Sequence, residues 1–133
     1  MDKVTFELVS PEKLLLSRPV DMVVVPGSEG DFGVLPRHAP VISTVRPGVI
    51  DVHEDGKVTD RIFVGGGFAE VTGERCTVLA EQALAVDDLD RGQAEQQLKD
   101  AREDLSDAKS DSERAAAERQ IAVAEAMLRV LES

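Results

Sequence analysis

The sequence predicts an α+β protein, in which an N-terminal β-sandwich or barrel over residues 1–86 precedes a C-terminal antiparallel α-helical hairpin over residues 87–133. The first observation is composition, because all six prolines, all four phenylalanines and nine of the ten glycines lie in the first part. The second is a set of turn signals that interrupt short apolar runs every few residues in that part. The third is an apolar stripe, spaced alternately by four and three residues, in each half of the remainder.

The first part contains short apolar segments that we predict to be strands. Residues 4–9 place Val4, Phe6 and Leu8 on one face, because side chains alternate across a strand. Residues 20–25 are almost all apolar, as in a strand that is covered on both faces. Other predicted strands include residues 14–16, 41–45 and 48–53.

Asp55-Gly56 is a strong hairpin signal, since both residues tolerate a positive φ. A strict two-residue loop would pair Glu54 with Lys57, which is favourable. The same register would set Asp51 against Asp60, which is unfavourable. The sequence therefore predicts the hairpin more firmly than its register.

Gly73-Glu74 predicts a second hairpin. A two-residue loop at this point sets Val71 against Cys76 and Ala69 against Val78. This register gives a consistent apolar face, so we expect it.

The second part predicts two amphipathic helices whose stripes alternate small and large residues, so that the helices can pack closely. A short break over residues 106–112 makes them antiparallel neighbours, and Ser110 or Ser112 can cap the second helix. Narrow stripes bury little surface, so we expect the hairpin to be marginally stable alone and to dock onto another surface. The stripes are Ala94, Leu98, Ala101, Leu105 and Ala108, and Ala117, Ile121, Ala124, Leu128 and Leu131.

The formal net charge of −11 comes from 26 acidic and 15 basic residues. Such a surface repels phosphates and anionic lipid head groups, so we expect neither nucleic acid nor bare membrane as a partner. The excess is shared, with −5 in residues 1–86 and −6 in residues 87–133. No stretch approaches the ~20 apolar residues of a membrane-spanning helix. Residues 1–4 lack the features of a signal peptide, so we expect a soluble intracellular protein of bacterial type.

Residue patterns typical of catalysis are missing from the sequence. His38 and His53 are the only histidines, and neither has metal-ligand spacing or a carboxylate partner four residues away. Cys76 falls mid-strand, where packing explains it better than nucleophilic chemistry. Gly27, Gly30 and Gly33 follow a strand, but acidic residues inside that segment would repel an anion. We therefore predict a non-catalytic protein without a metal site.

Residues 26–40 combine three glycines and three prolines with three large apolar residues. One interpretation is a rigid surface crossover whose apolar side chains tuck into the sandwich. The other is a preorganised interaction loop, because glycine and proline fix its shape and reduce the entropy lost on binding.

The chain resembles the epsilon subunit of bacterial F-type ATP synthases, the counterpart of the mitochondrial delta subunit. The matching residues are Gly30-x-x-Gly33-Val34-Leu35-Pro36-x-His38-Ala39-Pro40, then Gly66-Gly67-Phe68-Ala69-Glu70-Val71, and the two-helix tail. The resemblance implies a ten-stranded β-sandwich followed by a helical hairpin. It also implies a rotor subunit of the central stalk, peripheral to the cytoplasmic face of the bacterial inner membrane, in a proton-translocating complex.

In this family the sandwich binds the gamma subunit and touches the polar loops of the membrane c-ring. The resemblance makes Asp31, Pro36, His38 and Pro40 the candidate interface residues. A position in the core or in a turn is the structural alternative for His38.

In many bacterial relatives the helical hairpin folds on the sandwich in one state and extends into the catalytic alpha/beta head in another, where it blocks ATP hydrolysis. In some relatives ATP binds the hairpin through an (Ile/Leu)-Asp-x-x-Arg-Ala motif, which Asp88 and Arg91 match here. Asp87 and Gly92 replace its aliphatic residue and its alanine, and basic residues are missing where we look for them on the second helix. The alternative interpretation of the aspartates is favourable charge at a helix N-terminus. A free-standing nucleotide-sensing protein is the alternative function.

Overall fold

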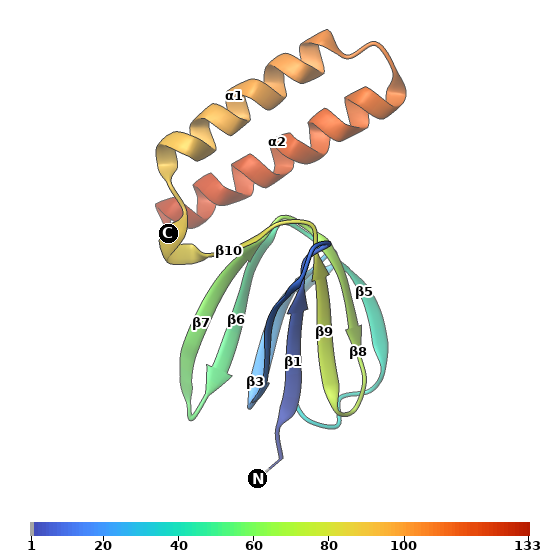
Figure 1. The fold of residues 1–133 in the computed structure, drawn as a ribbon, viewed down its shortest axis with the longest axis vertical. Coiled ribbons are helices and arrows are strands. Elements are labelled where there is room, and N and C mark those ends of the chain that lie inside the picture. The colour runs from blue at the N-terminus through green and yellow to red at the C-terminus, as the bar shows by residue number, and fades with distance from the viewer. Residues whose placement is uncertain (1) are drawn as a thin grey trace. The chain divides into compact units, whose positions relative to one another are not determined.

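A computed structural model describes residues 2–133 and divides the protein into two compact units. The first unit ends at Val86 and the second spans Asp87–Ser133. The first contains ten strands and the second contains two α-helices (Figure 1). The strands are β1 (Val4–Val9), β2 (Leu14–Val20), β3 (Met22–Gly27), β4 (Gly30–Val34), β5 (Val41–Val45), β6 (Gly48–Glu54), β7 (Lys57–Val64), β8 (Gly67–Val71), β9 (Arg75–Ala80) and β10 (Ala83–Ala85).

The strands follow the order β10-β7-β6-β3-β5-β8-β9-β1-β2, and β4 pairs with β3 outside this path. Every pairing is antiparallel except that of β1 with β9. β3 pairs with β6 through its first residues and with β5 only through Gly27, so it connects the two halves of the sheet. The result is the sandwich-like sheet that the sequence predicts.

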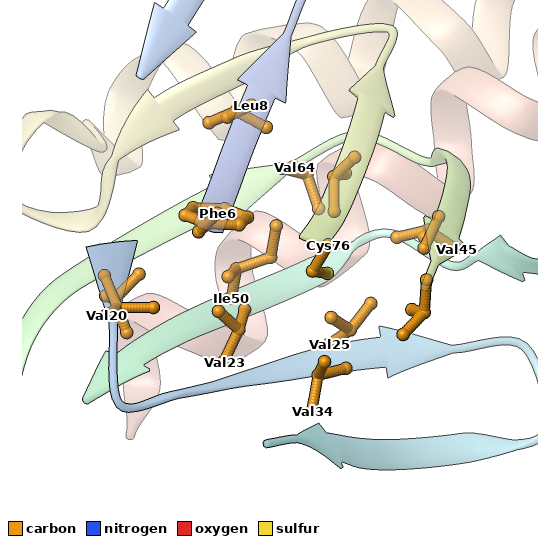
Figure 2. Packing of buried hydrophobic residues seen from close by; sticks show 14 of the residues in the cluster. Phe6, Leu8, Val20, Val23, Val25, Val34, Val45, Ile50, Val64 and Cys76 are labelled. Carbon is orange, nitrogen blue, oxygen red and sulfur yellow. The ribbon is translucent and has the colours of Figure 1, made fainter. Parts of the chain in front are cut away.

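The core lies between the two halves of this sheet (Figure 2). Val4, Phe6 and Leu8 are buried, which confirms the predicted inner face of β1. They meet side chains such as Val23 and Ile50 from the opposite half of the sheet. The alternation that predicts this strand therefore also positions the core.

The β8–β9 hairpin has the register that its sequence predicts. Val71 faces Cys76 and Ala69 faces Val78, and all four side chains are buried. A two-residue turn sets this register, which places the apolar side chains of both strands on one buried face.

The prediction of a single strand over residues 20–25 is wrong, since the strand is broken at Asp21 between β2 and β3. The Asp21 carboxylate accepts a hydrogen bond from the Lys3 ammonium at 2.5 Å and another from the Asp55 backbone N–H at 2.7 Å. These bonds tie the break to the residue before β1 and to the β6–β7 turn. They lower the pKa of Asp21, and the bond to Asp21 raises the pKa of Lys3.

The β6–β7 hairpin forms at Asp55-Gly56, with Glu54 facing Lys57 as predicted. A bulge between Val52 and His53 shifts the rest of the register, so that Asp51 faces Arg61 instead of Asp60. The unfavourable pair that a strict two-residue loop implies is therefore avoided.

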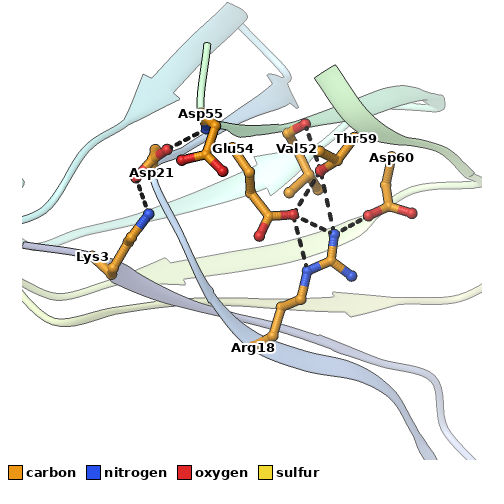
Figure 3. Close-up of polar contacts among 8 residues, drawn as sticks. All are labelled: Lys3, Arg18, Asp21, Val52, Glu54, Asp55, Thr59 and Asp60. Carbon is orange, nitrogen blue, oxygen red and sulfur yellow. Dashed lines mark hydrogen bonds and ion pairs between the residues drawn. The ribbon is translucent and has the colours of Figure 1, made fainter. Parts of the chain in front are cut away.

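Ion pairs join β2 to this hairpin (Figure 3). The Arg18 guanidinium pairs with Asp60 and, at 2.9 Å, with Glu54. Its pKa is raised, chiefly by the hydrogen bond to Asp60. The pKa of Glu54 is lowered, first by a hydrogen bond from Thr59 and then by Arg18. Arg18 thus links strands that are distant in the sequence.

The second unit is the predicted helical hairpin. α1 (Arg91–Asp107) and α2 (Asp111–Glu132) are capped by Asp90 and by Ser110, whose side chains accept the Gln93 and Glu113 backbone N–H groups. Four of the small residues in the predicted stripes are buried, whereas the larger residues are half-buried. The buried members are Ala94, Ala101, Ala117 and Ala124.

Candidate functional site

The segment over residues 26–40 is more regular than either sequence interpretation proposes, because it contains β4, paired along its length with β3. Gly30 follows the two-residue turn with a φ of 134°, which explains a glycine at this position. The Asp31 carboxylate lies 2.5 Å from Arg46 Nη2, and Arg46 Nη1 also donates to the Gly27 carbonyl. The exposed carboxylate of Asp31 is therefore held in place by a residue that directly follows β5.

The Pro36–Pro40 run is fixed by its backbone. Arg37 has a φ of 65°, and its N–H donates to the Gly73 carbonyl at 2.7 Å. The backbone N–H of His38 donates to the Leu35 carbonyl at 3.2 Å, and its Nδ1 lies 2.7 Å from the Ala39 carbonyl. Local bonds therefore hold this turn and the imidazole in one arrangement.

Three of the four predicted interface residues come together around one hollow. Asp31, His38 and Pro40 are among the residues that line this hollow, which has a volume of about 420 Å³. Pro36 lies within the turn that ends at His38 and is not one of the lining residues. The hollow lies on the β3–β4 hairpin and the segment leading to β5.

Asp88 and Arg91 both lie at the start of the second unit. Asp88 ends the short 3-10 helix η1 (Val86–Asp88), and Arg91 begins α1. Arg91 Nη1 lies 3.7 Å from a Glu132 carboxylate oxygen and 4.0 Å from one of Glu95. Two carboxylates therefore contact the guanidinium that the ATP motif would direct to phosphate.

Cys76 is fully buried in the core of the sandwich. Burial raises the pKa of its thiol to about 12, so the reactive thiolate is not populated near neutral pH. The residue acts as a small apolar side chain.

The outer face of β5, β8, β9, β1 and β2 carries an apolar surface that sequence reasoning missed. Phe68 faces Leu79, Leu79 faces Val9, and Val9 faces Leu14 across neighbouring strands. Phe68, Leu79 and Leu14 are each more than half exposed. Ile42, on β5, is 73% exposed. We call Val9, Leu14, Ile42, Phe68 and Leu79 the outer apolar surface.

Exposed large apolar side chains in one continuous row are uncommon on a surface that faces only water. The signal for this row was present in the sequence, because the Gly73-Glu74 register that buries Ala69 and Val78 turns Phe68 and Leu79 outward together. On the same face, the Glu7 carboxylate accepts a hydrogen bond from Thr77 at 3.2 Å and lies 3.3 Å from Arg75 Nε.

The structure describes residues 2–133 of the protein. No group of three or more His, Cys, Asp or Glu side chains is arranged to hold a metal ion there. None of the helices there is long and apolar enough to cross a membrane.

The structure therefore defines a two-unit α+β protein, a ten-stranded β-sandwich joined to a helical hairpin. Residues 3–86 match the sequence model of the family described as ATP synthase, Delta/Epsilon chain, beta-sandwich domain. Residues 90–133 match the model of the C-terminal domain of the ATP synthase epsilon chain. The protein therefore belongs to the ATP synthase epsilon chain family, which supplies a stalk subunit of the complex and not its catalytic subunit.

The relatives agree with this assignment. The ATP synthase epsilon chain of Paramagnetospirillum magneticum is 62% identical over 101 residues, which represent 76% of each protein. That of Rhodospirillum centenum is 63% identical over 106 residues, covering 76% of this protein and 73% of the relative.

Two solved structures share the fold. A subunit in the mitochondrial ATP synthase of Euglena gracilis, solved with its F1 and c-ring, aligns with a TM-score of 0.79 at 23% identity, covering 98% of this protein and 82% of that subunit. A subunit in the central stalk and c-ring of the Tetrahymena thermophila enzyme aligns with a TM-score of 0.72 at 13% identity, covering 96% of each.

Proposed function

We propose that this protein is a rotor subunit in the central stalk of a proton-translocating F-type ATP synthase, where it couples rotation between the catalytic head and the membrane ring. The outer apolar surface is the observation that carries the proposal, because a coupling subunit needs a permanent attachment to the rotor. Family membership supplies the complex in which this attachment is made.

The gamma subunit docks on the outer apolar surface. Phe68, Leu79 and Leu14 present side chains that lose their water contacts only in a complex, and burying apolar area contributes about 25 cal/mol per Å². A stable interface buries about 800 Å² of each partner. The surface lies on paired strands, so little conformational freedom is lost when it is covered.

The polar loops of the c-ring contact the hollow of the β3–β4 hairpin. Asp31, His38 and Pro40 line this hollow, and Pro36 fixes the turn that precedes His38. The Arg46 pair and the Arg37 backbone bond hold the site rigid, as transmission of torque requires. The net charge of −5 on residues 1–86 suits a ring surface that carries basic groups.

The subunit is peripheral to the cytoplasmic face of the bacterial inner membrane and is held there by its protein partners. Its helical hairpin reaches the catalytic alpha/beta head when it is extended. The paired state of Arg91 favours this mechanical role over the alternative, a free-standing nucleotide-sensing protein.

Co-elution with the purified gamma subunit on a sizing column tests the proposal. We expect a 1:1 complex with the full-length protein, and loss of that complex when Phe68 and Leu79 are both replaced by aspartate. Replacing Val58 and Leu35, two exposed apolar residues outside the outer apolar surface, by aspartate is the matched control. Failure of the unaltered protein to co-elute would contradict the proposal.

A further inference from the structure

Glu70 is an acidic residue within the proposed docking face. It lies on β8 opposite Ile42 of β5 and Thr77 of β9, two residues from Phe68 on the same outward face. Its side chain is exposed. Throughout residues 2–133, no basic side chain forms an ion pair with its carboxylate.

Glu7 provides the contrast within the same row of the sheet. Thr77 stands between the two glutamates, facing Glu70 on β8 and Glu7 on β1. Glu7 receives the Thr77 hydroxyl and the Arg75 guanidinium, so its charge is compensated within the protein. The exposed Glu70 carboxylate is instead solvated by water.

A partner that covers Phe68 and Ile42 removes water from Glu70, because these side chains adjoin it along and across the strands. Removing water from an unpaired carboxylate is costly, and the cost is offset only by an opposite charge or by strong hydrogen bonds. We propose that Glu70 determines specificity in the complex with gamma by pairing with a lysine or arginine side chain of that subunit. This inference rests on the proposed docking of gamma on the outer apolar surface.

The structure leaves room for such a side chain beside Glu70. A hollow of about 260 Å³ is lined by Glu70, Thr72, Thr77, Thr5, Glu74 and Arg75. Hydroxyl and carboxylate oxygens there accept hydrogen bonds from a cationic head group, and the lining guanidinium, that of Arg75, is paired with Glu7. The hollow adjoins the outer apolar surface at Phe68, so one segment of the partner can fill the hollow and also cover that surface.

Binding of the full-length protein to purified gamma, measured at several salt concentrations, tests the inference. We expect Glu70→Gln to raise Kd about 10- to 30-fold, mainly through faster dissociation, and to flatten the salt dependence. Glu70→Lys should raise Kd about 100-fold or more, because it places like charges together. Asp55→Asn, an equal change of charge in the β6–β7 turn, should change Kd less than about twofold.

Two measurements separate this inference from the docking proposal. Phe68→Ala tests docking on the outer apolar surface without changing a charge. The Tm of Glu70→Gln should stay within about 2 °C of that of the unaltered protein, since no internal ion pair is lost. Weaker binding by Phe68→Ala with unchanged binding by Glu70→Gln would overturn the role of Glu70 and retain the docking face. Unchanged binding by both variants would overturn the docking face and the inference together.

Discussion

The Asp51 carboxylate pairs with the Arg61 guanidinium, at 3.1 Å between Oδ1 and Nε. A regular β6–β7 hairpin would instead have placed Asp51 against Asp60, a repulsive cross-strand pair. The bulge leaves Thr59 without a partner in the ladder and frees Asp60 to pair with Arg18. One extra residue thus replaces a repulsive pair with two attractive ones.

Replacing Arg18 by methionine should destabilise the sandwich. The change keeps most of the apolar stem but leaves the Glu54 and Asp60 carboxylates close together without their shared cation. We expect a loss of about 1 kcal/mol at pH 7, a modest value because the side chain is partly exposed. Urea unfolding of the full-length protein measures it. Arg114→Met, which removes an ion pair with a fully exposed carboxylate on α2, is the control and should have little effect.

The effect of Arg18→Met should shrink in acid. The pKa of Glu54 lies below its ordinary value of 4.5, because Thr59 donates to its carboxylate and Arg18 pairs with it. A carboxyl group whose pKa is lowered by folding stabilises the fold at pH values above its pKa in the unfolded state. This contribution is lost as the pH falls through its pKa in the folded state. The free energies of unfolding of the unaltered protein and of Arg18→Met should therefore converge below about pH 4. A constant difference down to about pH 2 would contradict the assignment.

The registers of the two hairpins show where sequence reasoning succeeds and where it ends. The β8–β9 register follows from its own residues, because only one pairing puts Val71 and Cys76 on the same buried face. The β6–β7 register could not be predicted in this way. Its bulge is favoured by Arg18, which lies on β2 and has no sequence pattern linking it to that hairpin.

The candidate sites also contain features that the sequence predicts and features that it does not. The glycines and prolines singled out residues 26–40, and the family motif singled out His38. Sequence reasoning missed β4, because glycine is a poor strand former. It missed the outer apolar surface because an apolar residue in a strand is ordinarily read as core. Side chains alternate along β8, so the Phe68 side chain points outward when those of Ala69 and Val71 point into the core.

Gly67→Ala should strongly destabilise the sandwich. Gly67 has a φ of 147°, and an added Cβ would lie 1.9 Å from the Leu79 carbonyl oxygen in the paired strand. Because backbone must move to relieve this contact, we expect a loss of about 3 kcal/mol or more. Gly73→Ala is the matched control, since its Cβ would meet nothing closer than 3.7 Å. Thermal unfolding compares the two variants, and equal Tm values would contradict the prediction.

Ser110→Ala should loosen the first turn of α2. The Ser110 hydroxyl accepts the Glu113 backbone N–H at 3.1 Å, and an N-cap of this kind contributes about 1 kcal/mol. Ser112, the other candidate cap, contacts only the Ser110 hydroxyl, so Ser112→Ala should change little. Amide hydrogen exchange at Glu113 and Arg114 in the full-length protein reports the difference. Faster exchange in Ser112→Ala than in Ser110→Ala would show that the cap is assigned to the wrong serine.

ATP should bind the full-length protein weakly. The Arg91 guanidinium is paired with Glu132 and Glu95, and binding of a phosphate would have to break these contacts within a unit of net charge −6. We expect calorimetric titration to show no micromolar Kd, and Arg91→Gln to leave the weak signal unchanged. A micromolar Kd that Arg91→Gln removes would favour the nucleotide-sensing function instead.

Removing the helical hairpin should change ATP hydrolysis by the catalytic head less than about twofold. The hairpin has few basic side chains with which to bind the head, because residues 87–133 contain seven basic and 13 acidic side chains. This acidic excess would repel any acidic surface of the head that the extended hairpin meets. The measurement compares head and gamma reconstituted with the full-length protein and with a protein truncated after Val86. Both forms should bind gamma equally, because the outer apolar surface lies wholly before the truncation. A rate several-fold lower with the full-length protein would show that the hairpin inhibits despite its charge.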